Sequence, residues 1–265
     1  MKTVSPKLAT VAREKGVRHL SRFERCLTPF RAPEGGWRLA GWASSRIAAG
    51  VTDRQATASA RWLCVVEAEQ VHGASVAVIR RPPAGGPVAG CDALVTDVPG
   101  VTLAVRTADC LPIFFADPRR GIVGIAHAGW RGLAASLPGR MITVFQQVFR
   151  SRPEELHVAI GPAIRACCYE VGPEFPARFE PFVQTQHGRR PFDSAQGGLP
   201  SGVEGRRTCD LIGAAAAQLS ACGVRAERLL DTQRCTGCEP DVWFSLRREG
   251  PQTGRLCSWI MVRYL

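Results

Sequence analysis

Several features that define common protein classes are missing from this chain of 265 residues. No apolar run approaches the ~18 residues that would indicate a membrane span. The basic N-terminus is not followed by the continuous apolar stretch of a secretory signal, so we expect a cytoplasmic protein without membrane contact. The chain contains no Walker loop and no dinucleotide fingerprint, because HAGWRG does not match GxGxxG. It also has no internal repeat and no break in composition, which favours a single domain over residues 1–265.

Tyrosine is scarce, with only 2 residues, and the basic residues are scattered along the chain. The formal charge of +11, from 34 basic and 23 acidic residues, favours anionic partners. A nucleic-acid-binding protein usually gathers its basic residues on one face and adds aromatic side chains that stack on bases. Neither feature is visible in this sequence. We therefore expect small anionic molecules as partners and no specific nucleic acid.

The hydrophobic pattern predicts a layered protein that contains both strands and helices. Apolar segments bounded by turn residues predict buried strands at 101–105 and 121–127. The strongest helical pattern covers 209–224, where Asp210 is expected to cap the start and Gly223 to end the last turn. Strands and helices alternate without a strict βαβ rhythm. The expected class is therefore α+β (mixed α/β) layers, not a doubly wound sheet.

The predicted strands at 101–105 and 121–127 are each followed by or end in a residue that can bind a metal or act as a nucleophile. Cys110 follows the first strand in the turn TADC, and His127 closes the second before HAGWRG. Upstream, His72 lies in QVHG before another β-rich segment. Two imidazoles and one thiolate leave one position of a tetrahedral zinc open. The spacing alone favours hydrogen-bonded core histidines over a shared site, and Asp109 is either a proton carrier beside Cys110 or a turn residue.

The chain has 11 cysteines, and without a secretory signal these indicate free thiols, a metal site or a nucleophile instead of disulfides. Cys235 and Cys238 form a CxxC, but no second CxxC supplies two further ligands, so we expect the pair to be structural or incidental. Cys167 and Cys168 are adjacent, and neighbouring side chains usually diverge, so joint chelation is not expected. Six others are expected to be small buried apolar residues: Cys26, Cys64, Cys91, Cys209, Cys222 and Cys257.

In combination, these segments resemble the YfiH-like laccase-domain family, whose members are described as multicopper polyphenol oxidoreductases and as purine nucleoside phosphorylases. The resemblance rests on QVHG, LAVRTADCLPIFF, GIVGIAHAGWRG, AIGPAIRACCYEVGPEF and FSLRRE, which occur in the family's order over roughly residues 60–265. The N-terminal ~60 residues diverge, since the family's SLNLG…ENR segment is not recognisable. Two motifs also depart from the family pattern, with Ala163, Arg165 and Ala166 in the first and Leu246 in place of an aromatic residue in the second.

The resemblance implies a layered α/β/β/α sandwich shared with certain cysteine hydrolases. It implies zinc held by His72, Cys110 and His127, with copper as the older assignment for the family. The implied activities are phosphorolysis of adenosine, inosine, guanosine and methylthioadenosine, and deamination of adenosine. Purine nucleosides and phosphate are then the expected partners.

If the resemblance holds, Asp109 is the expected proton carrier, and the basic residues expected to bind phosphate are Arg131, Arg247 and Arg248. Two alternatives remain open. One is a Cys–His hydrolase acting on an amide or a cell-wall precursor, in which Cys110 is the nucleophile and His127 its base. The other is a non-catalytic metal-binding relative. Copper oxidase chemistry is least favoured, because a blue-copper site usually adds an axial Met and the chain has only 3 methionines.

Overall fold

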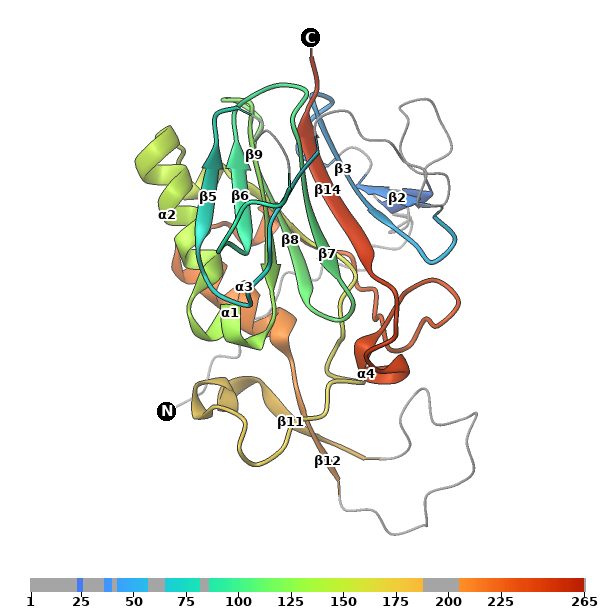
Figure 1. Cartoon of the computed structure of the whole chain (residues 1–265). Coiled ribbons are helices and arrows are strands. Elements are labelled where there is room, and N and C mark those ends of the chain that lie inside the picture. Colours follow the sequence, from blue (N-terminus) through green and yellow to red (C-terminus); the bar gives the residue numbers. More distant parts are fainter. Residues whose placement is uncertain are drawn as a thin grey trace, which may run out of the picture.

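The computed structural model describes residues 23–25, 36–39, 42–56, 65–81, 86–187 and 205–264. Two six-stranded sheets form the centre of the molecule (Figure 1). The first sheet contains, in spatial order, β1 (Phe23–Arg25), β2 (Gly36–Leu39), β3 (Ile47–Thr52), β14 (Leu256–Val262), β7 (Thr102–Thr107) and β4 (Val65–Glu67). The second contains β13 (Leu229–Asp231), β10 (His157–Ile160), β8 (Leu111–Asp117), β9 (Ile122–Ala128), β6 (Ala93–Thr96) and β5 (Val76–Ile79).

Strand pairing in both sheets mixes the two directions. The pairs β4–β7, β5–β6 and β10–β13 are parallel, whereas the remaining neighbours in the two large sheets are antiparallel. Both predicted central strands are present as β7 and β9, and β8 lies between them in the sequence. This mixed pairing confirms the expected α+β class and excludes a doubly wound parallel sheet.

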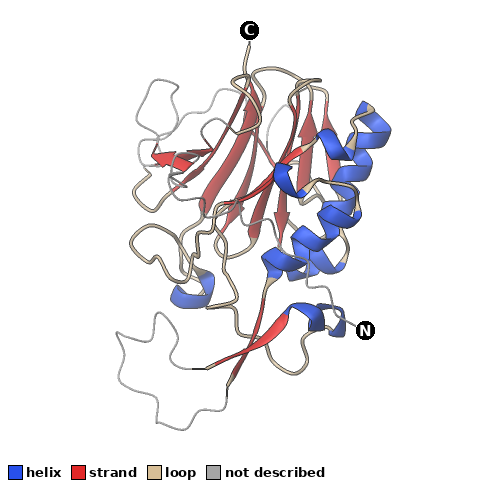
Figure 2. Ribbon diagram, turned by 180° about the vertical axis from the view of Figure 1, so that it is seen from behind, coloured by secondary structure: helices blue, strands red, loops and turns tan. Residues whose placement is uncertain are grey.

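Three helices pack on the outer face of the second sheet (Figure 2). They are α1 (Trp130–Ala134), α2 (Leu137–Phe149) and α3 (Leu211–Ala221). The caps of α3 are as predicted, because the Asp210 carboxylate accepts a hydrogen bond from the Gly213 N–H and Gly223 follows the helix with a φ of +92°. The remaining elements are short: η2 (Pro153–Glu155), η3 (Ala177–Phe182), β11 (Val183–Gln186), β12 (Arg206–Cys209), η5 (Ala226–Arg228) and α4 (Leu246–Glu249).

Two apolar layers hold these elements together. Leu103, Val105 and Ile260 of the first sheet meet Phe114 and Ile125 of the second in the layer between the sheets. The other layer lies between the second sheet and the helices, and its largest members include Phe115, Phe145, Leu133 and Leu219. Because β8 and β9 are buried on both faces, their backbones are rigidly held, and so are the residues at their ends. Within the described residues, none of the helices combines the length and the apolar character that crossing a bilayer requires.

Candidate metal centre

The structure brings His72, Cys110 and His127 together at one end of the second sheet, where β9 runs into α1 (Figure 1). One ligand atom of each residue lies within 4.8 Å of those of the other two. The two imidazole rings meet edge to face, with 4.8 Å between centroids and an interplanar angle of 86°. Pairing of Leu111 with Ala128 in the β8–β9 register fixes Cys110 beside the end of β9. Two imidazoles and a thiol therefore converge on one point.

Two residues around this point have unusual backbone conformations. His72 and Asp109 have left-handed φ values of +59° and +94°, a conformation that L-residues seldom adopt. Such strain usually persists only where the surrounding structure enforces it and is common at functional sites. Gly129 faces the ligands directly, since a Cβ at this position would lie 3.0 Å from Cys110 Sγ and 3.6 Å from His72 Cδ2. The absence of a side chain at Gly129 leaves room for the three ligands.

A fully buried carboxylate, Asp92, orients both histidines. Its Oδ1 lies 2.9 Å from His127 Nδ1, and it also accepts hydrogen bonds from the backbone N–H groups of His72 and Gly73, at 2.9 and 2.7 Å. With Nδ1 of His127 occupied by Asp92, Nε2 is the nitrogen available to a metal. A carboxylate behind a histidine ligand is a recurring feature of zinc sites, where it fixes the tautomer and the ring orientation.

Asp92 was not predicted from the sequence, because it precedes a short strand and has no distinguishing motif. The only signal that identifies it is strand register: β6 pairs with β9 through Ala93 and Ala126, which makes Asp92 the neighbour of His127. The His127 N–H accordingly donates to the Asp92 carbonyl at 2.8 Å.

The surroundings of Cys110, His127 and Asp92 shift their pKa values. Burial opposes ionisation of Cys110, but hydrogen bonds from His127 and His72 outweigh it and lower the pKa of its thiol to about 7. Burial likewise disfavours the charged form of His127, yet hydrogen bonds with Asp92 and Cys110 raise its pKa to about 9. Despite burial, the pKa of Asp92 is lowered by the hydrogen bonds from His127 and Gly73. Without metal, His127 is therefore mostly protonated at neutral pH, and the Cys110 thiol ionises in the same pH range.

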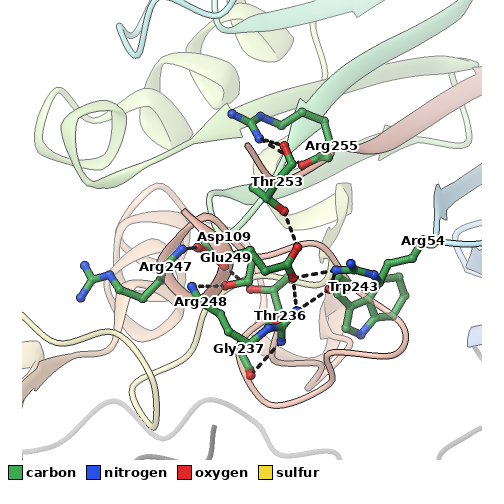
Figure 3. A network of polar contacts seen from close by, with 12 residues as sticks. Arg54, Asp109, Thr236, Gly237, Trp243, Arg247, Arg248, Glu249, Thr253 and Arg255 are labelled. Atoms are coloured by element: carbon green, nitrogen blue, oxygen red, sulfur yellow. Dashed lines mark hydrogen bonds and ion pairs between the residues drawn. The ribbon is translucent and has the colours of Figure 1, made fainter. Parts of the chain in front are cut away.

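Asp109 is buried, and both of its carboxylate oxygens are bonded within the protein. Thr236 donates its hydroxyl to Oδ1 at 2.6 Å, and the Arg247 backbone N–H donates to Oδ2 at 2.7 Å (Figure 3). These contacts attach α4 and the loop around Thr236 to the turn that carries Cys110. The geometry favours a positioning role for Asp109, and the proton-carrying role stays a prediction.

The three arginines expected to bind phosphate have different surroundings. Arg248 donates to the carbonyls of Thr236, Gly237 and Trp243 at 2.9 to 3.0 Å and contacts Glu249, so its guanidinium is committed to the fold (Figure 3).

Arg131 and Arg247 are exposed and stack on aromatic rings, Arg131 on Trp130 at 4.6 Å and Arg247 on Tyr169 at 5.0 Å. Burial raises the pKa of Tyr169 to about 12; the positive charges of Arg247 and Arg131 oppose this rise, and the charge of Cys110 adds to it. The Arg247 guanidinium, which stacks on Tyr169, also donates from Nη1 to the Glu170 carbonyl at 2.7 Å. Arg131 and Arg247 are the better placed candidates for phosphate.

The expectation that the CxxC pair has no further potential ligands nearby was wrong. Cys167 and Cys168 lie against Cys235 and Cys238, and the four sulfurs are within 4.8 Å of one another. Residues 166–168 form a turn, so the adjacent side chains are not forced to opposite sides as they are in a strand. Of the other cysteines, Cys91 and Cys209 are buried as expected and Cys222 and Cys257 are half-buried, while Cys26 and Cys64 lie outside the described residues.

Comparison with known proteins gives consistent matches. A family model described as multi-copper polyphenol oxidoreductase laccase matches residues 44–263. The purine nucleoside phosphorylase YlmD of Geobacillus stearothermophilus is 38% identical over 209 residues, or 76% of this chain and 72% of that protein. The adenosine deaminase RL5 of an unknown prokaryotic organism is 34% identical over 173 residues, or 64% of this chain and 62% of that protein. The crystal structure of YlmD from G. stearothermophilus has a TM-score of 0.76 and 30% identity, and covers 92% of this chain and 100% of that one. This likeness confirms the expected YfiH-like fold.

Proposed function

The chain belongs to the multi-copper polyphenol oxidoreductase laccase family, and from this premise we propose that it is a zinc-dependent purine nucleoside enzyme. The proposed reactions are phosphorolysis of adenosine, inosine, guanosine and methylthioadenosine, and deamination of adenosine. The names of its relatives, purine nucleoside phosphorylase and adenosine deaminase, support this substrate class.

One observation carries the proposal: His72, Cys110 and His127 converge with Asp92 behind them. Three protein ligands of this kind suit zinc and leave a fourth position open, as catalytic zinc sites do. Zinc held there would supply a Lewis acid that polarises a substrate group and makes water more acidic. Copper is the other candidate ion. The two methionines that the structure describes, Met141 and Met261, belong to apolar clusters, so neither supports a blue-copper arrangement.

The chain's own residues have distinct proposed roles. Asp92 holds the proton on His127 Nδ1 and thereby presents Nε2 to the metal. Arg131 and Arg247 supply positive charge for the phosphate that replaces the purine base at the sugar carbon during phosphorolysis. Asp109 holds the backbone of Arg247 in place through the bond to its N–H. In deamination, water replaces the amino group of adenosine, and ammonia leaves.

Product analysis tests this proposal. The purified protein is incubated with adenosine, with and without phosphate, and the products are separated by chromatography. We expect inosine and ammonia without phosphate, and additional free base and ribose 1-phosphate when phosphate is present. Cys110→Ala should abolish both reactions, whereas Cys222→Ala, a change in a half-buried cysteine at the end of α3, should abolish neither. Unchanged adenosine under both conditions would contradict the proposal.

A second function is favoured by one specific observation. The thiol of Cys110, whose pKa is lowered to about 7, lies beside His127, and His127 is hydrogen-bonded to Asp92. Nucleophile, base and orienting carboxylate in this order are the arrangement of cysteine hydrolases. The position of His72 argues for the metal, because a Cys–His pair does not require a second imidazole beside the same sulfur.

A further inference from the structure

A second group of ligands lies away from the His72–Cys110–His127 centre. Cys167 and Cys168 occupy the turn after β10, and Cys235 and Cys238 occupy the loop after β13. The Sγ of Cys167 is 3.6 Å from that of Cys235 and 3.4 Å from that of Cys238. The Sγ atoms of Cys168 and Cys238 are 3.4 Å apart. Together these residues form the four-cysteine cluster.

The sulfur separations distinguish a metal site from disulfides. Disulfide sulfurs are about 2.05 Å apart, and each sulfur has one partner. In the four-cysteine cluster, Cys167 and Cys238 each approach two other sulfurs at similar distances, so the contacts do not define pairs. Zinc with four thiolates at about 2.3 Å places the sulfurs about 3.8 Å apart at the corners of a tetrahedron. The observed separations are much closer to this arrangement.

The surrounding backbone is shaped to the sulfurs. A Cβ at Gly237, between the two cysteines of the CxxC, would lie 2.8 Å from both Cβ and Sγ of Cys168. Only glycine allows so close an approach of the two loops. Ile164 packs against Cys168 and Cys235 in a small apolar cluster that shields them from water.

We propose that the four-cysteine cluster binds one structural zinc ion, separate from the catalytic centre. Four protein thiolates fill a tetrahedral coordination sphere, so no position remains for substrate. The thiols lose their protons to solvent as the ion binds. This zinc joins the turn after β10 to the loop after β13, adding to the isolated bridge between Ala163 and Cys235 and to the ion pair between Arg165 and Asp231 at 2.8 Å. The inference goes beyond the proposed function, since it concerns a different set of residues.

The position of the four-cysteine cluster connects it to the catalytic centre. Thr236, inside the CxxC, donates to Asp109, the residue next to Cys110. The carbonyls of Thr236 and Gly237 accept hydrogen bonds from Arg248 of α4 (Figure 3). These bonds hold α4, from which the chain continues through a loop into β14. Removal of the structural zinc should therefore loosen the Asp109 contacts as well as the loop itself.

Zinc content per chain tests the proposal directly. By mass-spectrometric metal analysis, we expect two zinc ions in the wild-type protein and in the control Cys222→Ala. We expect one in Cys235→Ala/Cys238→Ala and one in His72→Ala/His127→Ala. If the catalytic zinc is absent, the wild type should still hold one ion, which only Cys235→Ala/Cys238→Ala loses. A failure of the proposed function can therefore be distinguished from a failure of the four-cysteine site. A single zinc ion that only His72→Ala/His127→Ala removes would overturn the four-cysteine site.

Two further measurements keep the test decisive if the cysteine variant does not fold. In His72→Ala/His127→Ala loaded with cobalt(II), the intact four-cysteine cluster should give the intense visible absorption of a tetrahedral cobalt–thiolate site, and its absence would overturn the proposal. Thiols are also counted in denaturant with chelator and without reductant. All 11 cysteines should react. Four fewer would mean two disulfides and would overturn the metal site.

Discussion

The carboxylate of Asp92 lies 2.9 Å from His127 Nδ1 and binds the backbone N–H groups of His72 and Gly73, so one buried side chain holds two of the three proposed metal ligands in place. Asp92→Asn keeps the shape but removes the charge. Loss of a partner behind a metal-bound histidine typically lowers metal affinity about 10- to 100-fold, and we expect this loss here. Chelator competition measures it. The control is Asp97→Asn, a change in a partly exposed residue paired with Arg80, and it should bind zinc like the wild type. Wild-type affinity in Asp92→Asn would remove Asp92 from the centre.

Gly129→Ala tests the space around the ligands. The backbone at Gly129 has φ −79° and ψ 177°, which alanine adopts without strain, so the effect should be local. Its Cβ would meet Cys110 Sγ at 3.0 Å, forcing a ligand to move by a few tenths of an ångström. We expect zinc affinity to fall about tenfold with little change in the unfolding midpoint. Gly139→Ala in α2 is the matched control, where the new Cβ makes an ordinary contact at 3.4 Å. Equal affinity in both variants would contradict this account of Gly129.

The pH dependence of zinc affinity follows from the shifted protonation. Zinc requires a neutral imidazole and a thiolate. In the metal-free protein, the pKa of His127 is about 9 and that of Cys110 is about 7, so protons compete for His127 below pH 9 and also for Cys110 below pH 7. Affinity should therefore fall as pH falls, by about tenfold per unit between pH 9 and 7 and more steeply below 7. Competition with a chelator of known protonation constants measures this slope. A flat profile between pH 7 and 9 would show that His127 is not a ligand.

Arg247 and Arg248 are adjacent but should respond differently to substitution. Arg248→Ala removes a mostly buried guanidinium that binds three carbonyls, and we expect the free energy of unfolding to drop by about 2 to 3 kcal/mol. Arg247→Ala, at an exposed position, should change stability by less than about 1 kcal/mol and raise KM for phosphate about tenfold. Urea unfolding and phosphate kinetics separate the two effects. The reverse pattern would reassign the phosphate contact to Arg248.

The residues of the centre were predictable to different extents. His72, Cys110 and His127 lie at or near the ends of segments whose apolar pattern is visible in the sequence. Their positions at strand ends made a shared site more plausible, but the family resemblance was needed to predict that they converge. Asp92 was not predictable, because its role depends on the register between β6 and β9, which the alternation of apolar residues does not specify across a pair of fully buried strands.

The four-cysteine cluster shows a different limit. Cys167 and Cys235 are 68 positions apart, and they meet because β10 and β13 pair in parallel before each chain segment turns back toward the other. Short-range spacing identifies metal sites whose ligands lie in one hairpin or finger, but here each loop contributes only two ligands. The expectation that adjacent cysteines diverge failed because the turn at residues 166–168 brings both side chains toward the CxxC loop.

The reactivity of Cys110 tests most directly whether the centre is a zinc site for purine nucleoside chemistry. The zinc-loaded protein is treated with iodoacetamide before and after chelation, each cysteine is followed by peptide mapping, and adenosine deamination is measured on the same samples. A metal-bound thiolate resists alkylation, whereas a free thiol with a pKa of about 7 reacts readily. Cys222 serves as the internal reference. We predict slow labelling of Cys110 with zinc, a large acceleration on chelation, and loss of deamination in step with the zinc. Rapid labelling of Cys110 in zinc-loaded protein, with hydrolytic activity that survives chelation, would contradict the account and favour a cysteine hydrolase.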